Sequence, residues 1–76
     1  MSSPTYQKVM TIMKMGVPTD VAQSALERLL KQNASSPDSM SVAVLKKIRI
    51  NLEGCVVLKG DQSKLPGIKQ QLDAVA

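Results

Sequence analysis

Histidine, tryptophan and phenylalanine are missing from this chain of 76 residues, and cysteine and tyrosine occur once each. The absence of histidine removes the commonest general base and the commonest zinc ligand. The six acidic residues do not pair at short spacing, and the four glycines form no phosphate-binding loop. We therefore expect a protein that is not an enzyme and that has no catalytic residues, no metal site and no cofactor.

A single cysteine, Cys55, rules out an internal disulfide and is typical of a protein from a reducing compartment. Its neighbours Val56 and Val57 predict a buried and unreactive thiol, because activation needs a nearby cation or a helix N-terminus. The longest run of strongly apolar residues, 55–58, is too short to span a membrane. The first residues contain no charged region followed by a long apolar run, so we expect no signal peptide. We expect an intracellular, cytoplasmic protein without a membrane segment.

The scarcity of aromatic residues, at 1% of the chain, limits the core to leucine, isoleucine, valine, methionine and alanine. A hydrophobic content of 43% is typical of a folded chain rather than a disordered one. Its length predicts a single helical domain over residues 1–76. Such a short chain buries a modest core, so a partner or a second copy of the chain could complete it.

Residues 19–33 have the clearest pattern in the sequence. Their apolar positions recur in pairs four residues apart, which indicates one continuous stripe on a helix. A helix with such a stripe must bury it against neighbouring elements, so we expect residues 19–33 to organise the core. The stripe consists of Val21, Ala22, Ala25, Leu26, Leu29 and Leu30.

Three more helices are predicted around this one, at about residues 4–15, 37–52 and 66–75. Ser3 followed by Pro4 is typical of a helix start, and Gly16 of a left-handed stop. By the same signals we expect Thr19 to cap the second helix and Ser36 to cap the third. The predicted fold class is all-α, a small four-helix domain.

The pattern is ambiguous over residues 48–60. Ile48, Ile50 and Leu52 alternate with polar residues, and residues 55–58 favour β structure. A helix that ends near Leu52 with Gly54 as its cap is one interpretation. A short β hairpin or an irregular insertion is the other.

Two short motifs resemble known families. Leu65-Pro66-Gly67-Ile68 resembles the hairpin of the helix-hairpin-helix family, whose modules bind the DNA backbone non-specifically through hairpin amides. This resemblance covers about residues 63–75 and departs at Lys69, where the family usually has a second glycine. The alternative interpretation of Pro66 is the start of an ordinary helix.

The second motif is Met15-Gly16-Val17, followed by a helix that contains Ala22 and Ala25. It resembles the ubiquitin-associated domain, which has a Met-Gly-aromatic loop between the first two of its three helices. Val17 stands where that family has an aromatic residue, and the similarity covers at most residues 6–50. Neither motif assigns the chain to a family.

The net charge of +4 is concentrated in residues 46–69, which hold six cations and two anions. On the third predicted helix, apolar residues lie beside cations away from the expected core face. An apolar centre with a charged rim is typical of a protein interface. We expect a non-enzymatic adaptor, inhibitor or complex subunit that binds a protein partner with an acidic rim. The candidate partner-binding residues are Val42, Lys46, Lys47, Arg49 and Ile50.

Nucleic acid is the alternative partner. Lysine and arginine over residues 46–69 would contact the phosphate backbone, which gives affinity without sequence readout. No aromatic residue interleaves with them, so stacking on single-stranded bases is not expected.

Overall fold

The computed structural model describes residues 3–75, which form four α-helices and one short 3-10 helix, with no strand in that range. The prediction of a small all-α domain with four helices is therefore confirmed. The elements are α1 (Pro4–Met13), α2 (Thr19–Gln32), α3 (Val42–Lys59), η1 (Gln62–Lys64) and α4 (Leu65–Val75).

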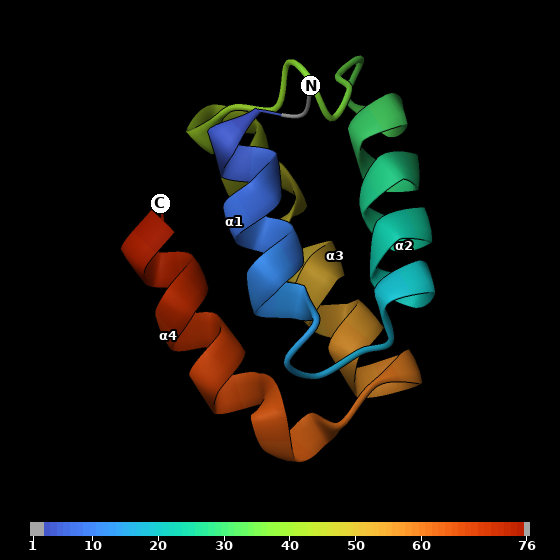
Figure 1. Ribbon diagram of the computed structural model, residues 1–76, viewed down its shortest axis with the longest axis vertical. Coiled ribbons are helices and arrows are strands. Elements are labelled where there is room, and N and C mark those ends of the chain that lie inside the picture. Colours follow the sequence, from blue (N-terminus) through green and yellow to red (C-terminus); the bar gives the residue numbers. More distant parts are fainter. Residues whose placement is uncertain (1–2, 76) are drawn as a thin grey trace.

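Successive helices run in opposite directions, and each packs beside two others (Figure 1). α1 lies between α2 and α4, and α3 lies behind α1 and also contacts both α2 and α4. This ring of contacts encloses one core, as expected when each helix has a single apolar stripe. No helix among the described residues is both long enough and apolar enough to cross a bilayer.

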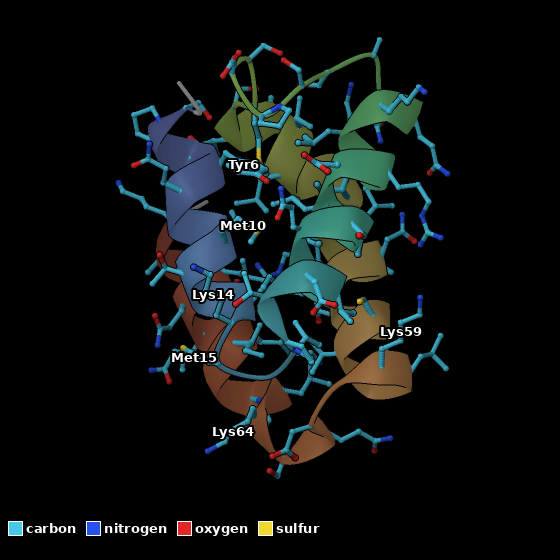
Figure 2. The ribbon with its side chains drawn as sticks, turned by 45° about the vertical axis from the view of Figure 1, so that its right-hand side comes forward. Tyr6, Met10, Lys14, Met15, Lys59 and Lys64 are labelled. Carbon is cyan, nitrogen blue, oxygen red and sulfur yellow. The ribbon has the colours of Figure 1, made fainter. Side chains whose placement is uncertain are left out.

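The core contains side chains from every α-helix and from the loops at both ends. Leu26 and Leu29 of α2 are buried, as the sequence predicts. Figure 2 shows Tyr6 and Met10 of α1 turned toward α2, and burial raises the pKa of the Tyr6 phenol. The buried cluster comprises Tyr6, Val9, Met10, Ile12, Met13, Val17, Ala22, Leu26, Leu29, Leu30, Met40, Leu45, Ile48, Leu52, Val56, Ile68 and Leu72.

The starts of α1 and α2 differ in how they are capped. Ser3 caps α1 as predicted: its side chain accepts a hydrogen bond from the Tyr6 backbone N–H, and Pro4 follows as the first helical residue. The prediction that Thr19 caps α2 is wrong. Thr19 is already helical, and Pro18 occupies the capping position without a side-chain hydrogen bond.

The limits of α3 correct the predicted helix at 37–52, because α3 spans Val42–Lys59. Pro37 lies in a turn, where its carbonyl accepts a hydrogen bond from the Ser3 N–H at 2.8 Å. Met40 is buried just before the helix, and Ser41 provides the cap instead of Ser36. The loop is therefore held by the core and by the start of α1. As a result, α3 begins at Val42 rather than at residue 37.

No hairpin forms over residues 48–60, and Gly54 lies inside α3 rather than at its end. A strand would place Ile50 on the same face as Ile48 and Leu52, but Ile50 is 81% exposed while the other two are buried. Val56 continues the buried helical stripe at a spacing of four from Leu52. Burial of this stripe outweighs the local β preference of residues 55–58.

Gly16 and Gly60 bring two loops together at one end of the molecule. The N–H of Asp61 donates to the carbonyl of Gly16 at 2.8 Å, which joins the α1–α2 loop to the α3–α4 connection. A Cβ on Gly60 would lie 2.4 Å from that carbonyl oxygen and 2.4 Å from Val17 Cγ1. Gly16 does not have the predicted left-handed conformation, because no described glycine has a positive φ. Close packing, rather than an unusual dihedral angle, is therefore what these two positions require.

Neither family resemblance extends to the structure. All four residues of Leu65-Pro66-Gly67-Ile68 are helical and belong to α4, so they form no hairpin. The three-helix arrangement of a ubiquitin-associated domain also differs, because α4 contributes Ile68 and Leu72 to the shared core.

Candidate functional site

The outer surface of α3 has the most exposed large apolar side chains among the described residues. Ile50 is 81% exposed and Leu58 is 83% exposed. They lie eight residues apart in one row with Gly54 midway, so about 12 Å of helix separates them. We call Ile50, Gly54 and Leu58 the α3 row. Val57, beside Leu58 in the sequence, is also exposed.

The α3 row borders a shallow groove between α2 and α3, with a volume of about 480 Å³. We call it the α2–α3 groove. Side chains of α2 and α3 line it together because the two helices pack side by side through their buried stripes. Its lining includes Arg28 and Leu29 from α2, and Ile50, Gly54, Cys55 and Leu58 from α3.

Positive charge surrounds this apolar surface. Arg28 and Lys59 line the α2–α3 groove, and Lys46 and Lys47 precede Ile50 by one helical turn. These four side chains have no acidic partner among the ion pairs of residues 3–75, and no described acidic residue lines the groove. The surface therefore combines an apolar row with cations that are free to meet a negatively charged partner.

Arg49 does not belong to this surface, although the sequence grouped it with Ile50. Its guanidinium pairs with Glu53 at 3.3 Å, with Asp73 of α4, and with the Lys69 carbonyl at 3.1 Å. The hydrogen bond to Asp73 raises the pKa of Arg49, and the same bond lowers the pKa of Asp73. Arg49 therefore joins α3 to α4 instead of presenting a free charge.

The Arg49–Asp73 pair predicts a stability difference that depends on pH. Because the pKa of Asp73 is lowered on folding, its ionised form stabilises the fold above about pH 4, and this contribution is lost as the pH falls through the folded-state value. Asp73→Asn should therefore lower the melting temperature at pH 7 by a small amount. The two proteins should converge in acid.

Thermal melts of both proteins from pH 2 to pH 7 measure this difference. In an Arg49→Gln background, Asp73→Asn should have little further effect, because its partner is already absent. A difference of equal size at every pH would show that Asp73 acts through something other than its charge.

The other predicted site residues all lie in the first half of α3. Lys46, Lys47 and Ile50 are exposed near one another, whereas Val42 lies two turns before Ile50 and outside the α2–α3 groove. The sequence prediction missed Leu58 because it placed residues 55–58 in a strand or an irregular segment. Once α3 is known to continue through Gly54, the spacing of four between Ile50, Gly54 and Leu58 identifies the α3 row.

The basic residues of 46–69 do not gather into one patch. Arg49 and Lys69 are paired with Glu53, Lys69 at 3.5 Å, so their charges are partly neutralised. Lys59 and Lys64 point toward different sides of the molecule (Figure 2). About 18 Å of helix separates Lys47 from Lys59. A phosphate backbone would meet dispersed cations here, whereas the α3 row places two exposed apolar side chains on one face of a single helix.

Cys55 is only partly buried, so its predicted burial is not complete. The thiol lines the α2–α3 groove, where it can report on access to the groove by its rate of chemical modification. Within residues 3–75, cysteine and acidic side chains form no group of three that could hold a metal ion.

Comparison of the chain with protein-family models, with curated proteins and with solved structures found no match.

Proposed function

We propose that this protein acts by binding another protein through the outer surface of α3 and the adjoining groove. The observation that carries the proposal is the exposure of Ile50 and Leu58 in one row of the same helix. Covering one such side chain contributes about 1.5–3 kcal/mol, so two of them supply a substantial part of a small interface. An adaptor, an inhibitor or a subunit of a complex would use such a surface.

The cations at the edge of this surface support a partner with an acidic rim. Lys46, Lys47 and Lys59 are exposed and lack acidic partners within the described chain. Complementary charge of this kind accelerates encounter and orients the partner, while the apolar centre provides most of the affinity. The single, partly exposed Cys55 supports a reducing, cytoplasmic setting for this interaction.

Ile50→Asp should reduce capture of the partner at least tenfold, because it places a charge where apolar contact is expected. Its helix content and melting temperature should stay close to those of the original protein, since Ile50 is 81% exposed. The measurement is a pull-down from a native extract with tagged proteins, followed by circular dichroism. Gln23→Asp is the matched control, because Gln23 is exposed on α2 and does not line the α2–α3 groove.

Nuclease treatment and a salt series separate this function from binding to nucleic acid. Capture through this surface should survive nuclease and weaken only modestly with salt, since its apolar centre provides most of the affinity, whereas phosphate contacts weaken steeply as salt rises. Capture that disappears after nuclease treatment would favour the nucleic-acid alternative. Equal capture by Ile50→Asp and Gln23→Asp would contradict the assignment of this surface.

A further inference from the structure

Gly54 lies at the centre of the α3 row, in a space that the fold leaves open. An ideal Cβ built at Gly54 meets no heavy atom within 4 Å, in contrast to the crowded positions of Gly16 and Gly60. A glycine inside a helix lowers stability relative to alanine because it adds flexibility to the unfolded chain. Packing within the described chain therefore does not require a glycine at this position.

The shape of the α3 row points to a close approach from outside. Ile50 and Leu58 stand one turn before and one turn after Gly54, so their side chains border a gap above its backbone. Packed helices place the side chains of one helix into such gaps of the other. A gap with a glycine as its floor also allows the two backbones to come unusually close.

Among the common modes of peptide recognition, the groove fits a helix. Strand addition needs an open sheet edge, and residues 3–75 contain no strand. Polyproline segments dock on grooves lined by aromatic rings, but the only aromatic residue, Tyr6, is buried in the core. An amphipathic helix needs a groove between two helices with apolar side chains along it. The α2–α3 groove has such side chains from both helices, together with the polar Gln32 and Asn51.

The charges around the groove specify the flanks of that helix. Arg28 and Lys59 line the groove, and Lys47 lies one turn before Ile50. Asp20 shares an adjoining hollow with Arg28 and Lys59, but it forms no ion pair with either, and no described acidic residue lines the groove itself. A second copy of the chain would bring the same cations against one another, which is unfavourable. A helix with glutamate or aspartate on both sides of its apolar stripe complements them.

We propose that an acidic amphipathic helix of a partner protein lies in the α2–α3 groove, with its backbone close to Gly54. This inference rests on the proposed function and names the class of partner. Gly54 sets how closely the helix approaches. The α3 row supplies apolar contact, and Arg28, Lys47 and Lys59 select the acidic flanks.

Two synthetic helical peptides of about 18 residues provide the first test. Both carry leucine at the spacing of an amphipathic helix, one with glutamate and the other with lysine at the flanking positions. The glutamate peptide should bind the full chain at least tenfold more tightly than the lysine peptide does, as measured by fluorescence anisotropy. It should also slow maleimide modification of Cys55, which lines the groove.

Gly54→Leu provides the second test, because a Cβ at this position meets no heavy atom within 4 Å and the longer side chain extends into the groove. It should weaken binding of the glutamate peptide at least tenfold while its melting temperature stays the same or rises. Ala43→Leu is the matched control: it adds the same side chain at an exposed position of α3 outside the groove, and it should bind as the original protein does.

Three results would overturn the inference. The first is the absence of both binding and Cys55 protection with the glutamate peptide. The second is full binding by Gly54→Leu. The third is a dimer of the original protein in sedimentation that Gly54→Leu abolishes, which would make a second copy the occupant. The pull-down with Ile50→Asp tests the proposed function separately. If Ile50→Asp loses capture but the glutamate peptide does not bind, the surface binds a protein that is not an acidic amphipathic helix.

Discussion

Replacing Gly60 by alanine should lower the free energy of unfolding by about 3 kcal/mol, because the new methyl group has no room. It would lie 2.4 Å from the Gly16 carbonyl oxygen, a backbone atom that cannot rotate away. Relief of the clash requires the two loops to separate, which breaks the hydrogen bond from the Asp61 N–H to Gly16. The melting temperature should fall by roughly 12–24 °C.

Two other glycines serve as controls in the same melting experiment. Gly16→Ala should cost less than Gly60→Ala, because its new methyl group meets chiefly the end of the Ile68 side chain, at 2.7 Å, which can adjust more easily than a backbone atom. Gly54→Ala should raise stability by about 0.5–1 kcal/mol, since the space there is open and alanine favours the helix. Equal effects at all three positions would show that flexibility of the unfolded chain, rather than steric contact, governs these glycines.

Leu26→Ala should lower the free energy of unfolding by about 2–5 kcal/mol, because it removes a side chain that is completely buried in the middle of α2. The loss combines apolar contact with a cavity that the surrounding helices fill only in part. A chain of this length has a total stability of roughly 4–11 kcal/mol. The variant should therefore be partly unfolded at moderate temperature, as urea titration followed by circular dichroism would show.

Leu58→Ala is the matched control for Leu26→Ala, because it makes the same chemical change at a leucine that is 83% exposed. It should change the urea midpoint little and should weaken partner capture instead. A large loss of stability in Leu58→Ala would mean that the α3 row belongs to the core. Retention of full stability in Leu26→Ala would contradict the burial of the α2 stripe in the core.

Much of the helical architecture could be predicted because the apolar spacing of α1, α2 and α4 is regular. The boundaries predicted for these helices lie within two residues of Pro4–Met13, Thr19–Gln32 and Leu65–Val75. Here local signals and burial agree: Ser3 caps α1, and the stripe of α2 is buried apart from Val21, which is half-exposed. When the capping signal and the apolar spacing indicate the same helix, a single sequence is sufficient to predict that helix.

The candidate site was predicted only in part, because its geometry depends on α3. Ile50, Lys46 and Lys47 are exposed near one another, as the helical interpretation required. Arg49 was misplaced, because sequence spacing does not reveal that Asp73, 24 residues away, lies opposite it. Leu58 was missed because the β preference of its segment concealed its place in the same row as Ile50.

The sequence by itself determined a mostly helical chain without histidine, with a leucine-rich stripe in residues 19–33 and an excess of positive charge. These properties depend on residue type and on spacing within one segment. Tertiary structure decided that α3 continues through Gly54 to Lys59, because burial of Val56 against the other helices outweighs local preference. It also decided which glycines are required for packing and which cations are free. Those outcomes depend on contacts between residues far apart in the chain, such as Gly16 with Gly60, which no local pattern specifies.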